Sequence, residues 1–300
     1  AVVAGAATMS EAKHSAPVYG ANPMHRTYAP TASERRSSAE KKAATEEVDY
    51  DQYFDAIMAP PDPDERYYMR IERTGTFSRH YKCYLERVES PRSVVKVSAF
   101  AGKLLFEAQK IKASVRANYH IWLVLNDERA NGGKYFGKVR KISDGIYSCF
   151  DDGLNPSKMS KSDNPSLARR EFMALLYDQA SEASEQDFRT ITCIVPSPTS
   201  IARRDELLEL WAERALTSEH VVLNSRTPQL IDGAYHLDFE GPEERVQVAS
   251  PMNFVLEDVK SRKNRLQVGK MAKGVYSCDF RAPISPFQAF ALALGAFDVN

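Results

Sequence analysis

Residues 285–298 read SPFQAFALALGAFD and, apart from Gln288 and Asp298, they are almost entirely apolar and small. Ser285 can cap a helix N-terminus, and Pro286 stands where the first turn loses no hydrogen bond, so the sequence predicts a helix that begins here. About a dozen residues give about 18 Å of helix, which is too short to cross a bilayer. A helix that is apolar on every side must instead be surrounded by protein.

The segments that could surround this helix follow one another from about Glu65 onward as short runs of alternating apolar and polar residues. They are YYMRIER, YKCYLERV, VVKVSAF, ANYHIWLVL, KYFGKVRKI, GIYSCFDD, RTITCIV, EHVVLNS, AYHLDFEG, FVLEDVK, RLQVGKM and VYSCDFR. A period of two is typical of strands. About twelve strands with few helices between them favour an antiparallel sandwich or a closed barrel. Two further segments, residues 165–180 and 204–216, are predicted as amphipathic helices on the sheet surface.

The apolar helix decides between these architectures. A dozen antiparallel strands can close into a barrel wide enough to enclose more than side chains. We therefore predict a mainly β fold with few helices, namely a closed twelve-stranded antiparallel β-barrel around a central hydrophobic C-terminal α-helix.

Residues 1–64 differ in composition, being rich in Ala, Ser, Pro, Glu and Lys. Such a stretch buries too little apolar surface to offset its ordering entropy, so we predict a disordered N-terminal segment and linker, with the barrel domain in residues 65–300. The aromatic cluster of Tyr50, Tyr53 and Phe54 is interpreted as a local turn packed against the domain, with a short docking motif as the alternative.

The composition also limits the chemistry. The chain has 40 basic and 40 acidic residues, so there is no global attraction to nucleic acid or membrane, and an anion site must be a local patch. The four cysteines show no C-x-x-C pairing, which argues against a disulfide framework or a zinc site and favours a reducing, intracellular setting. The six histidines show no ligand spacing. We predict no metal and no cofactor.

No catalytic motif stands out. GGKYFGKV, residues 132–139, comes near a P-loop, but Val139 stands where Ser or Thr should hold magnesium, and the continuation is predicted as a strand. H-E-x-x-H, G-x-S-x-G and G-x-G-x-x-G are all missing from the sequence. We therefore predict that the protein is not an enzyme.

Seven motifs in order carry a family resemblance, namely KYFGKVR, FDDGLNP, CIVP, LNSRTPQL, YHLDFEG, VASPMNF and SPFQAFALALGAFD. From about Arg66 to the end, the chain resembles the C-terminal domain of the tubby and tubby-like protein family. The resemblance implies a twelve-stranded barrel around a hydrophobic helix, binding of phosphoinositides, chiefly phosphatidylinositol 4,5-bisphosphate, and no catalysis. The chain departs from the family at Lys141 and Ile142, where Ser-Asn is common.

The positions that match the family's ligand site are basic or polar. In Lys138-Val139-Arg140 the pleat puts both cations on one face, about 7 Å apart, where they can engage separate phosphates of one inositol ring. The resemblance adds Asn118 as a hydrogen-bonding group and Arg169 near the start of a predicted helix, whose N-terminus would favour anions. The expected headgroup ligands are Lys138, Arg140, Asn118, Lys112, Arg169 and Lys110. Without the resemblance, Lys138 and Arg140 would be interpreted as solvated strand surface.

Two functions remain open. The first is a peripheral membrane adaptor that reads phosphatidylinositol 4,5-bisphosphate in the cytoplasmic leaflet, acts in trafficking or signalling, and is released when the headgroup is hydrolysed. Its N-terminal segment would recruit a protein cargo. The second is a nucleic-acid-binding transcription regulator in the nucleus. We favour the first, because net charge is zero and few aromatic residues interleave with the basic ones. We expect a monomer in the cytoplasm, peripheral to the plasma membrane.

Overall fold

The computed structural model describes residues 50–75, 79–89, 101–111, 118–178, 190–197 and 206–299. The chain divides into two compact units, Ala1–Val48 and Asp49–Asn300, and every described residue lies in the second. The prediction of disorder for residues 1–64 therefore falls mostly outside the described residues, as does the predicted strand VVKVSAF.

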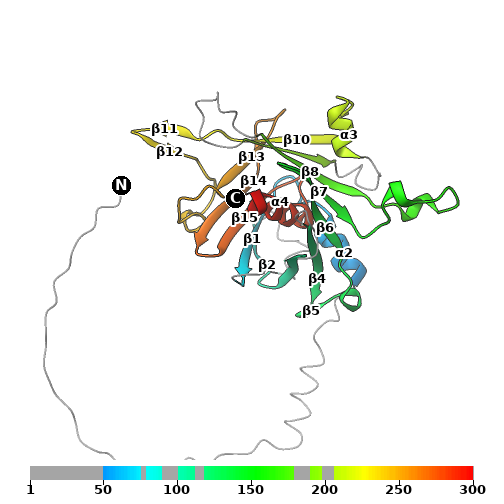
Figure 1. Cartoon of the computed structure of the whole chain (residues 1–300). Coiled ribbons are helices and arrows are strands. Elements are labelled where there is room, and N and C mark those ends of the chain that lie inside the picture. Colours follow the sequence, from blue (N-terminus) through cyan, green and yellow to red (C-terminus); the bar gives the residue numbers. More distant parts are fainter. Residues whose placement is uncertain are drawn as a thin grey trace, which may run out of the picture. The chain divides into compact units, whose positions relative to one another are not determined.

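Twelve strands close into one antiparallel barrel, as predicted (Figure 1). Around the barrel they run β3, β2, β1, β15, β14, β13, β10, β9, β8, β7, β6 and β4, and the pairing of β3 with β4 closes the ring. Their bounds are β1 Arg66–Thr74, β2 His80–Glu89, β3 Leu104–Lys110, β4 Asn118–Leu125, β6 Gly137–Ser143, β7 Ile146–Asp151, β8 Glu171–Asp178, β9 Thr190–Pro196, β10 His220–Ser225, β13 Phe254–Asp258, β14 Asn264–Ala272 and β15 Val275–Phe280.

The other elements are short. Strand β5, Glu128–Arg129, pairs only with β4, and β11, Gln229–Ile231, forms a separate hairpin with β12, Ala234–His236. The α-helices of the described residues are α2 Tyr50–Met58, α3 Leu207–Ala212 and α4 Pro286–Val299. The 3-10 turns are η2 Asn131–Gly133, η3 Pro156–Lys158, η4 Pro165–Leu167 and η5 Glu243–Arg245. In the described part of the chain, no helix is both long enough and apolar enough to cross a membrane.

Helix α4 fills the barrel, as the apolar C-terminal segment predicts (Figure 1). Its start is capped reciprocally, because the backbone N–H of Gln288 donates to Ser285 Oγ and the backbone N–H of Ser285 donates to Gln288 Oε1. The Phe290 ring is fully buried and stacks on Phe106 of β3, with ring centroids 5.4 Å apart. The helix is therefore the core around which the strands close.

Helix α2 belongs to the same unit, which corrects the predicted boundary at residue 65. The buried Tyr53 hydroxyl lies 3.0 Å from the Leu105 carbonyl oxygen and 2.7 Å from that of Val124. The Phe54 ring meets Phe136 edge to face at 5.4 Å. Tyr53 and Phe54 thus pack against the domain, as interpreted from the sequence, but in a helix, and the compact unit begins at Asp49.

The structure contradicts one helix prediction and adds a strand. Residues 171–178, predicted as helix, form β8, whereas the predicted helix in residues 204–216 exists as the shorter α3. The register of β8 against β7 shifts between Cys149 and Phe150, so Phe172 faces the core helix while Ala174 packs outward against Leu207 of α3, and both faces of the strand are buried. The added strand is β3, which was not predicted because its sequence, LLFEAQK, lacks a clear period of two.

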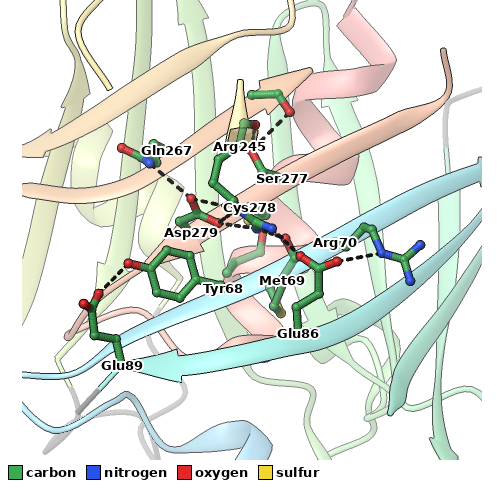
Figure 2. Close-up of polar contacts among 12 residues, drawn as sticks. Tyr68, Met69, Arg70, Glu86, Glu89, Arg245, Gln267, Ser277, Cys278 and Asp279 are labelled. Atoms are coloured by element: carbon green, nitrogen blue, oxygen red, sulfur yellow. Dashed lines mark hydrogen bonds and ion pairs between the residues drawn. The ribbon is translucent and has the colours of Figure 1, made fainter. Parts of the chain in front are cut away.

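A buried arginine fastens the segment 237–253 to the outside of the barrel (Figure 2). Cys278 faces α4, with its Sγ 3.7 Å from the Ala289 carbonyl, so Ser277 and Asp279 on either side point outward. Arg245 of η5 donates from Nη2 to Asp279 Oδ1 at 2.5 Å and to the Met69 carbonyl at 2.7 Å, and it also pairs with Glu86. The guanidinium therefore holds strands β1, β2 and β15 to this segment.

Candidate functional site

The outer face of strands β4 and β6 carries the predicted cation pair. Val139 is fully buried and points inward, whereas Lys138 is half-buried and Arg140 is exposed. The pairing register sets Arg140 opposite Asn118 and Lys138 opposite His120. The predicted period-two arrangement is therefore present, and Asn118 stands beside Arg140 on the neighbouring strand.

Arg169 also lies in this cluster, but not near the start of a helix, as was predicted. It follows the single 3-10 turn η4 and precedes β8, so there is no helix macrodipole at this point and that part of the expectation is wrong. Its guanidinium carbon lies 3.8 Å from the ring centroid of Phe150, which is the cross-strand partner of Lys138. Gly153 permits this close approach, because a Cβ there would lie 2.5 Å from the Arg169 Cα.

The clustered cations perturb one another. Burial, followed by the charge of Arg169, lowers the pKa of Lys138, and burial, followed by the charge of Arg140, lowers the pKa of Arg169. None of the ion pairs found among the described residues includes any of these three cations. The nearby Asp151 pairs with Arg170 instead, at 3.0 Å. An anion bound across the three cations would relieve their repulsion.

Polar and aromatic groups complete the site. The Oδ1 atom of Asn118 is buried and has no hydrogen-bond donor within the described part of the chain. His120 stacks on Tyr135 with ring centroids 4.2 Å apart, and burial, helped by the charge of Lys138, lowers the pKa of His120. The imidazole is therefore neutral at pH 7 and adds no charge. Sequence reasoning missed His120, Tyr135 and Phe150, although Phe150 begins the FDDGLNP motif.

Lys110 lies apart from this cluster. Its Nζ lies 2.7 Å from Asp298 Oδ1, near the end of α4. That carboxylate also accepts hydrogen bonds from Tyr119 at 2.7 Å and from Tyr147 at 3.0 Å. Lys110 pairs across the strands with Tyr119, whose side chain is buried inside the barrel, so Lys110 shares the inner face. Lys112 lies outside the described residues.

Other chemistries find little support in the described residues. No group of three metal-ligating side chains occurs among them. The four cysteines are unpaired and buried, and burial raises the pKa of the Cys193 and Cys278 thiols. The stretch that comes near a P-loop places Gly132 and Gly133 in η2 and runs on into strand β6, whereas a P-loop leads into a helix.

Comparison with known proteins adds independent information. The model of the Tub family matches residues 57–299. The chain is 28% identical over 265 residues to Tubby-related protein 1 of Homo sapiens, covering 84% of this chain and 46% of that protein. It is 30% identical over 213 residues to Protein king tubby 2 of Culex quinquefasciatus, covering 66% of this chain and 48% of the relative. The chain thus spans about half the length of the curated relatives it matches.

Proposed function

The chain belongs to the Tub family, and on this premise we propose that its barrel domain binds phosphoinositide headgroups, chiefly phosphatidylinositol 4,5-bisphosphate, as a peripheral membrane adaptor without catalytic activity. The observation that carries the proposal is the convergence of Lys138, Arg140 and Arg169, none of which forms a close ion pair with a carboxylate among the described residues. Such a cluster costs free energy unless an anion neutralises it.

The geometry matches the chemistry of a phosphorylated inositol ring. Arginine offers a planar fork to one phosphate, and lysine offers a point charge to another. The buried Oδ1 of Asn118 would accept a hydrogen bond from a ring hydroxyl, which removes the cost of an unsatisfied acceptor. The site is on the outer surface of β4 and β6, so a headgroup reaches it while the lipid stays in its leaflet.

The energy scale suits reversible attachment. Each basic group near an anionic leaflet contributes about 1 kcal/mol, and the contribution falls away within a Debye length. Three such groups tether the protein to the membrane, and hydrolysis of the headgroup releases it. The adaptor would then act at the cytoplasmic face of the plasma membrane as a monomer, with a cargo protein recruited by the N-terminal segment.

Within the described ranges, no specific observation favours the nucleic-acid alternative. Aromatic rings do lie beside the basic residues, but the Phe150 ring is covered by Arg169 and the Trp122 ring by Arg129, at 3.8 and 4.0 Å. These faces are therefore closed to stacking bases.

Vesicle co-sedimentation of the full chain tests the proposal. We expect binding to vesicles with phosphatidylinositol 4,5-bisphosphate, weak binding to vesicles matched in charge by phosphatidylserine, and loss of the selective binding in Lys138→Ala/Arg140→Ala. The matched control is Lys260→Ala/Lys263→Ala, which removes the same charge from the exposed turn between β13 and β14. Equal binding to both vesicles, or an equal loss in the control, would contradict the proposal.

A further inference from the structure

The loop between β7 and β8, residues 152–170, is built as a rigid projection. Its two arms are joined by a parallel bridge between Leu154 and Ala168, with the Leu154 N–H donating to the Leu167 carbonyl at 2.8 Å. Each arm ends in a 3-10 turn capped by an asparagine side chain, Asn155 before η3 and Asn164 before η4. The loop therefore holds its shape through its own hydrogen bonds.

This β7–β8 loop exposes two leucines. Leu154 and Leu167 are 50% and 52% exposed, although each residue lies on a hydrogen-bonded arm. The two residues lie on adjacent backbone arms, and exposed large apolar side chains are unfavourable in water and mark contact surfaces. Arg169 comes two residues after Leu167, and its N–H donates to the Leu154 carbonyl at 2.8 Å. The leucines therefore flank the cation cluster of the headgroup site.

The charges of the loop select the partner. Lys158 and Lys161 are exposed, and neither forms an ion pair with another described residue. The acidic residues are engaged, since Asp152 pairs with Lys134 at 2.6 Å and Asp163 accepts the Ser160 N–H at 2.7 Å. A surface that combines these lysines with exposed leucines complements an anionic lipid leaflet, which offers negative headgroups above an apolar layer.

We propose that the β7–β8 loop inserts Leu154 and Leu167 into the membrane interface when a phosphoinositide headgroup occupies the neighbouring cation cluster. The inference rests on the proposed function and adds a second, apolar contact with the same leaflet. The headgroup fixes position and specificity, while the leucines lengthen the residence time on the membrane. Insertion of this kind buries side chains about 5–10 Å into the headgroup and acyl boundary.

The first test separates headgroup affinity from membrane affinity. We expect the full-length variant Leu154→Ser/Leu167→Ser to bind soluble inositol 1,4,5-trisphosphate with wild-type affinity, but to bind phosphatidylinositol 4,5-bisphosphate vesicles about tenfold more weakly, because interfacial binding scales with buried apolar area. The matched control is Leu230→Ser/Ile231→Ser, which removes exposed apolar residues from the β11–β12 hairpin. Figure 1 shows this hairpin and the β7–β8 loop on opposite sides of the domain.

The second test reports insertion directly. The native cysteines at positions 83, 149, 193 and 278 are all buried, so a cysteine introduced as Leu154→Cys can be labelled selectively with an environment-sensitive dye. We expect a blue shift, and quenching by nitroxide lipids, when phosphatidylinositol 4,5-bisphosphate vesicles are added. A dye at Leu230→Cys should show neither.

The outcomes distinguish the two proposals. If the wild type binds the soluble headgroup, but the serine variant binds vesicles normally and the dye does not respond, insertion is wrong and the proposed function stands. Insertion is equally wrong, and the proposed function equally unaffected, if the leucines are needed only to capture a protein partner. If the wild type binds neither headgroup nor vesicles, the proposed function fails and insertion fails with it.

Discussion

Among single residues, two arrangements of partly buried cations differ in their surroundings. Lys138 and Arg169 are clustered with like charges, and burial is the main reason why the pKa of each is lowered. Lys110 is instead neutralised by Asp298, 2.7 Å away. Lys138 and Arg169 gain most from an added anion, whereas Lys110 already has Asp298 as its counterion. Substitutions at these positions should therefore separate headgroup binding from folding stability.

Replacing Lys110 should affect stability alone. In Lys110→Met, Asp298 loses a charged donor near the end of α4, where a carboxylate is already unfavourable for the helix dipole. We expect a loss of about 1–3 kcal/mol in the free energy of unfolding and an unchanged affinity for inositol 1,4,5-trisphosphate. Lys138→Met should show the reverse pattern. Chemical denaturation and calorimetric titration measure both quantities, and a loss of headgroup affinity in Lys110→Met would return this residue to the site.

Glu171 predicts a pH dependence of stability. Burial is the main cause that raises its pKa to about 7, while its Oε2 accepts the Leu207 N–H at 2.6 Å. Because the raised pKa favours the protonated carboxyl in the folded state, protonated Glu171 contributes to folding stability. This contribution is complete below about pH 4.5 and is lost as the pH rises through 7. Glu171→Gln should be more stable than wild type at pH 8 by up to about 3 kcal/mol, and similar at pH 5.

Urea denaturation of the two proteins at both pH values checks this expectation. The control is Glu209→Gln, which removes an exposed carboxylate from helix α3. If the difference between wild type and Glu171→Gln is the same at pH 5 and pH 8, then Glu171 does not titrate in this range.

The sequence could predict only part of the site. Lys138 and Arg140 follow from the pleat, because their alternation with an apolar valine fixes the face they occupy. Arg169 reaches them through a loop closure that depends on Gly153 and on the Phe150 ring, contacts that no local pattern encodes. The position of Lys110 was not predictable for a related reason, because the burial of its partner Asp298 depends on how α4 lies in the barrel.

Among the structural elements, most barrel strands were predictable from their sequence patterns, including several that are buried on both faces, whereas β8 was not. Alternation identified β1, β2 and β6, whereas β8 carries good helix formers and is buried from inside by α4 and from outside by α3. Tertiary packing overrode its propensity. The core helix was predictable for the opposite reason, since uniform apolarity leaves a helix no exposed position.

The Arg245 clamp gives a prediction for the segment it holds. In Arg245→Met, the fully buried carboxylate of Asp279 loses its charge partner (Figure 2). We expect a loss of about 3–5 kcal/mol, because an uncompensated buried charge is left behind. The double variant Arg245→Met/Asp279→Asn should recover part of this loss. Urea denaturation gives the stabilities, and limited proteolysis should cut residues 237–253 first; strictly additive losses would contradict the clamp.

At the scale of the whole molecule, a chain of zero net charge is proposed to find an anionic surface through one local cluster. Such a protein should show a shallow salt dependence, because few charges are neutralised on binding. The β7–β8 loop and the cation cluster adjoin one another on one face of the barrel, so a single approach to the leaflet engages both. The opposite β11–β12 hairpin stays away from the membrane in this orientation (Figure 1).

Calorimetric titration of inositol 1,4,5-trisphosphate into the full chain and into Lys138→Ala/Arg140→Ala, with thermal melts to verify folding, tests directly whether this cluster binds the headgroup. We predict one binding site in the wild type and a loss of affinity of about hundredfold or more in the variant, because two charge-assisted contacts disappear. Wild-type affinity in a folded double variant would contradict the assignment of this cluster as the headgroup site.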